Sequence, residues 1–169
     1  MTRTLAILLV LLTTLGCGYR LAGHGPNPAP VALKGKRISI HILQNHTGEP
    51  DVEYTITRAI VSEFIRTPQI RVVRKDGEAD YILKGSVTKY DKDVLSLDYR
   101  GTGQYYELTV TISLTLTDTS TGKTIELGKL TEDSQYHMAS DVEVSKAHER
   151  EALRRISQEL AQRLTAMLL

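Results

Sequence analysis

One stretch of sequence decides the fold class: Tyr105-Tyr106-Glu107-Leu108-Thr109-Val110-Thr111-Ile112-Ser113-Leu114-Thr115-Leu116-Thr117. Aliphatic side chains occupy every second position from Leu108 to Leu116, and threonine or serine occupies the positions between them. This period of two predicts a β-strand. Such clean alternation is typical of an antiparallel strand that is buried on one side only. We therefore expect a sheet with a hydrophobic core against one of its faces.

Further strands are predicted on both sides of this stretch. Upstream, apolar patterning predicts strands at 38–43, 70–74, 81–90 and 94–100, with a break at Asp91-Lys92-Asp93 between the last two. In the first of these strands, Ile38, Ile40 and Ile42 are expected to share one face. Downstream, a turn at 118–123 leads into a strand that starts at Thr124 and that Gly128 is expected to bulge. The polar stretch 131–141 is expected to be a loop or a frayed edge.

Two helices complete the pattern. The first, at 50–66, begins with Pro50, and its apolar residues at helical spacing are Val52, Ile56, Ala59, Ile60 and Phe64. The second, at 142–168, has an apolar stripe made of Leu153, Ile156, Leu160, Leu164 and Met167. This order of elements predicts an α+β fold. We expect a two-layer sandwich, in which two helices pack on one face of a mixed or antiparallel sheet of about four or five strands.

The N-terminal residues predict export. One cation near Met1, an apolar run at 5–12 and small residues before Cys17 give residues 1–16 the order of a secretory signal peptide. The apolar run is shorter than the ~20 residues that a transmembrane helix needs. Residues 17–36 are rich in glycine and proline and are expected to form a flexible tether. Residues 37–169 are expected to form a single domain.

Cys17 is the only cysteine in the chain, so it has no internal disulfide partner. Its place after Leu15-Gly16 resembles the lipobox of bacterial lipoproteins, in which the thiol receives a diacylglyceryl group and the new amino terminus is acylated. Several acyl chains would anchor the domain firmly. Gly18 stands where an Asp would indicate inner-membrane retention, so the resemblance implies the periplasmic side of the outer membrane. The alternative is an ordinary secreted protein with an incidental cysteine at its cleavage site.

Composition and motifs exclude several functions. A net charge of +1, one Phe and no Trp give no basis for binding nucleic acid. The five histidines are isolated in the sequence, so a zinc site is not expected. The chain has neither a Gly-x-Ser-x-Gly nor a His-Glu-x-x-His motif. We therefore expect a protein that is not an enzyme, with no cofactor other than the acyl groups on Cys17.

Two surface features have both a plain and a functional interpretation. The threonine and serine row at 109–117 can simply be the water-facing side of a sheet. It can also pack into a polar cavity such as the lumen of an outer-membrane barrel. Arg100, next to Tyr99 at a strand end, can be a solvated charge or a phosphate contact, because a guanidinium is well shaped for phosphate.

The chain resembles the LptE family of lipopolysaccharide-assembly lipoproteins. Its start at 15–21 is similar to that family's Cys-Gly-aromatic-x-Leu start, and the segments 83–87, 97–101 and 106–110 are similar to its central strands. The last helix, at 151–164, fits as well. The resemblance implies an outer-membrane lipoprotein that plugs the LptD barrel, helps it assemble and assists the delivery of lipopolysaccharide. It also implies that Arg100 and, in a second basic site, Lys146 contact lipid A phosphates.

A second resemblance leaves an alternative open. The segments 44–48 and 79–87 are similar to lipoproteins of the curli-secretion and peptidoglycan-synthase-activator type. An activator often needs a long tether to cross the periplasm, whereas a barrel plug needs one compact domain. The short tether predicted at 17–36 favours the plug.

Overall fold

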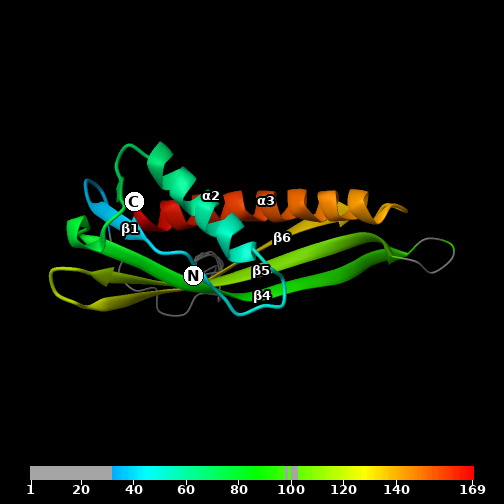
Figure 1. Cartoon of the computed structure of the whole chain (residues 1–169), viewed down its shortest axis with the longest axis horizontal. Helices are drawn as coiled ribbons and strands as arrows, with labels where there is room; N and C mark the ends of the chain where they lie inside the picture. The colour runs from blue at the N-terminus through cyan, green and yellow to red at the C-terminus, as the bar shows by residue number, and fades with distance from the viewer. Residues whose placement is uncertain (1–31, 98, 100–102) are drawn as a thin grey trace, which may run out of the picture.

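The computed structural model describes residues 32–97, 99 and 103–169, so the predicted signal peptide, Cys17 and Arg100 lie outside the described residues. Two helices lie on the same side of a long, twisted sheet (Figure 1). The elements in order are β1 (Arg37–Ile40), β2 (Gln44–Asn45), α2 (Val52–Arg66), β3 (Arg71–Val73), the 3-10 turn η1 (Asp76–Glu78), β4 (Tyr81–Leu97), β5 (Gly103–Asp118), β6 (Thr124–His137) and α3 (Val142–Leu168). The predicted two-layer α+β sandwich is confirmed.

The sheet is mixed and has six strands, against the four or five predicted. Its order is β3-β1-β4-β5-β6. The short strand β2 also pairs with β4, on the same side of β4 as β1 but farther along that strand. β1 runs parallel to β3 and β4, whereas β4, β5 and β6 form an antiparallel meander. The connection between β1 and its parallel neighbours runs through α2, so the chain crosses the helical layer before it returns to the sheet.

The extra strand arises because the predicted strand at 38–43 is split into β1 and β2. The chain leaves the ladder after Ile40, so the alternation of the sequence ends there: Ile42 is 58% exposed, and Leu43 is buried in its place. The backbone amide of Leu43 donates to the Thr57 hydroxyl of α2 at 3.1 Å. This contact with α2, which the sequence pattern does not reveal, turns Leu43 toward the core.

β4 is one continuous strand of 17 residues, and the predicted break at 91–93 is wrong. A bulge between Val87 and Lys89 changes which residues point inward. Leu83 and Val87 face the helices before the bulge, whereas Tyr90 and Lys92 pair with the buried Val110 and Leu108 after it. The two aspartates therefore lie on the outer face of a regular strand.

The stretch at 131–141 was expected to be a loop or a frayed edge, but β6 extends through its first part, to His137, and only residues 138–141 lie outside the strand. It pairs with β5 as far as His137, and the predicted bulge at Gly128 (φ 84°) is confirmed, because Leu114 pairs with Gly128 and Thr115 with Glu126. The stretch looks unlike a strand because two of its three inward positions, Glu132 and Ser134, are polar, and only Tyr136 is a buried core residue. Glu132 accepts a hydrogen bond from Arg163 of α3, and Ser134 accepts one from Arg155 of α3.

The core lies between the helices and the inner face of β5. The five alternating aliphatic residues of β5 are all at most 1% exposed, as predicted. α3 spans the predicted residues and is capped by Asp141, whose side chain accepts from the amides of Glu143 and Val144. The predicted stripe of α3 is wrong at its end. Met167 is 37% exposed and Leu168 is buried instead, because the position four residues after Leu164 continues the inward face.

The packed domain begins before the predicted boundary at residue 37. Leu33 is fully buried, and its amide donates to the carbonyl of Leu168 at 2.8 Å. The amide of Gly35 donates to the carbonyl of Gln69 at 2.7 Å. The last residues of the predicted tether therefore belong to the domain, because Leu33 closes the core at the end of α3.

Candidate functional site

Lys146, one of the two basic residues proposed from the sequence, belongs to one end of the domain. β4 ends there, and β5 and α3 begin there (Figure 1). We call this region the hairpin end and define it as residues 90–97 of β4, 103–108 of β5, 133–137 of β6 and 142–149 of α3. Arg100 falls between β4 and β5 in the sequence and lies outside the described residues.

Lys146 lies in the second turn of α3 and is exposed. Its Nζ atom is 3.7 Å from Oε1 of Glu143, one turn earlier in the same helix. Such an exposed pair within one helix is weak, so the ammonium can leave it for another anion at little cost. The structure therefore presents Lys146 as an accessible cation at the hairpin end.

A partly buried charged cluster holds the start of α3 on β4. Nζ of Lys92 lies 2.6 Å from Oε1 of Glu149 and 3.5 Å from Oε2 of Glu49. The Tyr90 hydroxyl donates to the same Glu149 oxygen at 2.7 Å. The cluster therefore joins β4, α3 and the segment before α2.

The environment shifts the pKa values of this cluster. Burial and the hydrogen bond to Glu149 raise the pKa of the Tyr90 hydroxyl far above its usual range. Burial acts to lower the pKa of Lys92, but the hydrogen bond and the charge of Glu149 outweigh it, and that pKa is raised as well. Tyr90 thus stays a neutral donor and Lys92 a cation at physiological pH.

Sequence reasoning missed this cluster. The break predicted at 91–93 would interrupt β4 at Lys92, and the sequence does not show that Glu149, whose side chain is only 17% exposed, meets it. The available signal was the alternation of Tyr90, Lys92 and Val94, which continues a period of two across the supposed break.

Aromatic residues fasten β6 to β5 and to α3 at the hairpin end. The ring of His137 lies edge-on to that of Tyr105, with 5.2 Å between centroids, and 6.2 Å from that of His148. Nδ1 of His148 also lies 2.8 Å from the carbonyl oxygen of His137. Tyr106 stacks on Tyr136 across the same two strands. These contacts make the hairpin end a defined platform.

Apolar side chains are nonetheless exposed on this platform. They are 44–66% exposed and come from both layers: Val94, Leu95, Leu97, Tyr105, Val142 and Val144. Single exposed apolar residues are ordinary, but a group of them at one end of a domain is typical of an interaction surface. The hairpin end thus combines accessible apolar surface with the cation of Lys146.

The outer face of the sheet is the second notable surface. No described helix covers it, and it carries the row Thr109, Thr111, Ser113, Thr115 and Thr117 that the sequence predicted to face away from the core. Part of this row is bonded within the sheet. The hydroxyls of Thr111 and Thr131 lie 2.9 Å apart, and those of Thr117 and Thr124 lie 3.1 Å apart.

The described residues form neither a metal site nor a membrane-spanning helix. Residues 32–97, 99 and 103–169 contain no group of three or more His, Cys, Asp or Glu side chains placed to hold a metal ion. Within the same residues, neither α2 nor α3 has a stretch that is both long and apolar enough to cross a membrane.

Solved structures of low sequence identity share this fold. A putative lipoprotein from Caulobacter crescentus CB15 matches with a TM-score of 0.53 and 16% identity, covering 75% of this chain and 86% of that chain. The rare lipoprotein B from Shewanella oneidensis matches with a TM-score of 0.52 and 20% identity, covering 78% of this chain and 92% of that chain. These likenesses show the fold alone.

Comparison with curated proteins gave no match. A family model gives the assignment: the model of LptE, described as lipopolysaccharide-assembly, matches residues 35–168. That range spans every described element, from β1 to α3. The resemblance stated from short segments of sequence is therefore confirmed over nearly the whole folded domain, and the chain belongs to the LptE family of lipopolysaccharide-assembly proteins.

Proposed function

We propose that this protein docks in an LptD-like outer-membrane barrel and helps lipopolysaccharide reach the cell surface. The observation that carries the proposal is the LptE family match, which covers residues 35–168 and assigns the chain to lipopolysaccharide assembly. We further propose that Cys17 carries the acyl groups that hold the domain at the periplasmic side of the outer membrane. The anchor would raise the local concentration of the domain beside its barrel.

The outer face of the sheet supports docking in a barrel. Its central row of hydroxyl groups is neutral and makes hydrogen bonds, and barrel interiors of this class are polar. A flat apolar face would be poorly matched to such a lumen. In this proposal the outer face meets the barrel wall around Thr109.

The hairpin end supports contact with lipopolysaccharide. Lys146 offers an accessible cation, and the neighbouring apolar side chains offer surface for a lipid. We propose that Lys146 and Arg100 contact phosphates of lipid A, with the guanidinium of Arg100 able to bind two phosphate oxygens at once. The role is that of a binding and scaffolding protein rather than a catalyst.

Affinity purification from the host tests the barrel partner. The full-length protein should recover an LptD-like barrel, and a photo-crosslinking side chain at Thr109 on the outer face should form an adduct with it. The matched control is the same side chain at Glu159, which is exposed on α3. Recovery of a secretion pore or a peptidoglycan synthase without a barrel would favour the alternative function and contradict this proposal.

Charge reversal tests the lipid contact. Lys146→Glu and Arg100→Glu should each weaken lipopolysaccharide binding by the purified protein by about tenfold, because a contact to a charged group contributes roughly 1.5–3 kcal/mol. Lys123→Glu, in the turn between β5 and β6, makes the same change of charge away from the hairpin end. Equal weakening by all three variants would show that binding depends on the net charge of the protein and not on contacts at the hairpin end.

A further inference from the structure

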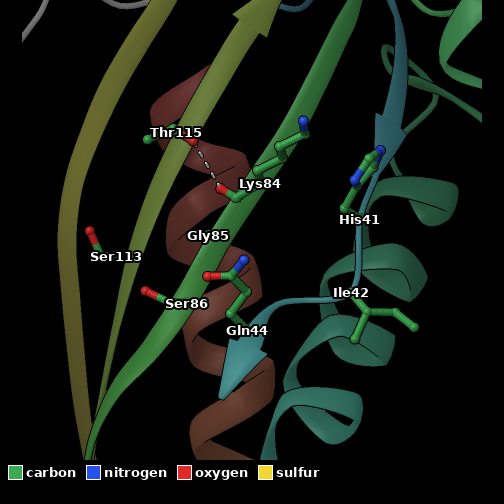
Figure 2. A pocket seen from close by; sticks show the side chains of 8 residues that line it. All are labelled: His41, Ile42, Gln44, Lys84, Gly85, Ser86, Ser113 and Thr115. Atoms are coloured by element: carbon green, nitrogen blue, oxygen red, sulfur yellow. Dashed lines mark hydrogen bonds between the residues drawn. The ribbon is translucent and has the colours of Figure 1, made fainter. Parts of the chain in front are cut away.

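A pocket of about 280 Å³ lies on the outer face of the sheet, away from the hairpin end. It is lined by β4 and β5 on one side and by the segment between β1 and β2 on the other: His41, Ile42, Gln44, Lys84, Gly85, Ser86, Ser113 and Thr115. Figure 2 shows the Gln44 amide projecting from β2 over β4 beside Ser86, while the Lys84 side chain extends toward His41. We propose that this pocket binds an anionic sugar, that is, a monosaccharide that carries a phosphate or a carboxylate.

The split between β1 and β2 creates the pocket. The chain leaves β4 after Ile40 and returns at Gln44, and the detour places His41 and Ile42 beside the outer face. Gly85 lets β4 and β5 lie close together here, since a Cβ at this position would be 2.3 Å from the carbonyl oxygen of Ser113. The floor of the pocket is therefore tight, regular sheet rather than a loose loop.

Polar groups of the pocket lack partners in the described part of the chain. Lys84 has no carboxylate within ion-pair distance among those residues, and the side chains of Gln44, Ser86 and Ser113 have no hydrogen bond to another described residue. Elsewhere on the same face, Thr111 bonds Thr131 and Thr117 bonds Thr124. An ammonium, an amide and two hydroxyls are thus gathered in the pocket without being bonded to other described side chains.

These groups define the class of the ligand. Lys84 is the only lining residue with a permanent charge, so the ligand should carry a negative charge. Asp76 does not line the pocket, and its carboxylate is bonded to the Ser39 hydroxyl at 2.6 Å and to His41 at 2.9 Å. These hydrogen bonds, with a smaller contribution from the charge of Lys84, lower the pKa of Asp76. The hydroxyls and the amide suit a ligand rich in hydroxyl groups. The lining has no Phe, Tyr or Trp to stack a nucleobase.

The size of the pocket agrees with a single sugar ring. Pockets for drug-sized ligands begin at roughly 300 Å³, so this one is at the small end of that range. The exposed Ile42 at its rim offers apolar surface to one face of the ring.

Titration of the purified full-length protein tests the proposal. Glucose 1-phosphate and glucuronate are added separately while the NMR signals of Gln44, Lys84, Gly85 and Ser86 are followed, and at least one of these two sugars should give saturable shifts. The two arms distinguish phosphate from carboxylate as the preferred anion. Lys84→Gln should weaken the binding by about tenfold, because it removes the charge-assisted contact. Lys123→Gln, which makes the same change of charge outside the pocket, should leave it unchanged.

Three outcomes would overturn the proposal. Glucose binding as tightly as both anionic sugars would show that the charge of Lys84 is not used. Inorganic phosphate binding as tightly as glucose 1-phosphate would show that the sugar is not recognised. Shifts that do not saturate, or that persist unchanged in Lys84→Gln, would show that the pocket is not a site. A Gln44→Leu variant, which keeps the charge, gives a second check and should also weaken binding.

Discussion

The two faces of β5 carry alternate residues of the same strand and have opposite surroundings. The inward residues, from Leu108 to Leu116, are buried beneath α2 and α3. The outward residues between them carry hydroxyl groups, and no described helix covers them. The inner face therefore supplies most of the stability that this strand contributes. The outer face is free to serve as a contact surface, because changes there disturb little of the packing.

Substitution in the middle of the inner face should have the largest effect. Ile112→Ala removes a fully buried side chain and should lower the free energy of unfolding by ~2–5 kcal/mol. Its neighbour Ser113 points outward, and Ser113→Ala should change the free energy by at most ~0.5 kcal/mol. Urea denaturation of both variants measures the contrast. Equal losses would show that the outer face is also packed in solution.

The charged cluster at the hairpin end extends the inner face beyond the apolar core. Glu149→Ala leaves Lys92 and Tyr90 without their shared acceptor and should lower the free energy of unfolding by ~1–3 kcal/mol. The loss should fall toward the lower value because Lys92 is 37% exposed and partly solvated. Glu143→Ala is the matched control, because Glu143 lies earlier in the same helix and its side chain is exposed. It should have almost no effect in the same denaturation experiment.

The edge of β6 separates the two faces, and arginines of α3 cover part of it. Arg155 donates to the carbonyl of Gln135 at 2.9 Å, and Arg163 donates to that of Thr131 at 3.1 Å. The double change Arg155→Ala and Arg163→Ala should lower the free energy of unfolding by ~1 kcal/mol or less, but it should increase self-association by freeing strand acceptors.

Light scattering at increasing protein concentration measures this self-association. Arg154→Ala is the control, because Arg154 bonds Glu151 and Gln158 of its own helix and does not touch β6. If the control and the double variant associate equally, the arginines do not protect the edge.

The smallest effect is expected at the opposite side of the sheet, where Arg37 of β1 meets Asp80. Hydrogen bonds from the side chain and amide of Arg37 lower the pKa of Asp80 to about 2. A carboxyl whose folded pKa is depressed stabilises the fold above its unfolded pKa of about 3.9, and that contribution is lost as the pH falls toward 2. Asp80→Asn should therefore make stability less dependent on pH between 4 and 2, as thermal unfolding at several pH values will show. An unchanged pH dependence would contradict this assignment.

The pattern of apolar and polar residues predicted a strand or helix well where the burial of each residue depends only on its position within that element. The alternation of β5 and the bounds of α3 were predicted from the sequence and are observed. Prediction failed where partners from elsewhere in the chain decide. Two inward positions of β6, at 132 and 134, are polar because Arg163 and Arg155 bond to them there. Leu43 turns inward because Thr57 accepts its amide proton.

The candidate sites show the same division. Lys146 was chosen from a family resemblance, and the structure places it at the exposed hairpin end, whereas the position of Arg100 is still a prediction. The Lys92 cluster and the pocket at Lys84 were not predicted. Each joins segments that are far apart in the sequence, from Glu49 to Glu149 in one and from His41 to Thr115 in the other.

The sequence by itself therefore determined the fold class, the one-sided burial of β5 and the family, because periodicity and short motifs are local properties of the chain. Only the tertiary structure decided that β4 is continuous, that Lys92 is paired and that β1 and β2 are separate strands. Those features depend on bulges, register and contacts with the helices. Their free energies come from partners that meet only when the sheet and the helical layer have assembled.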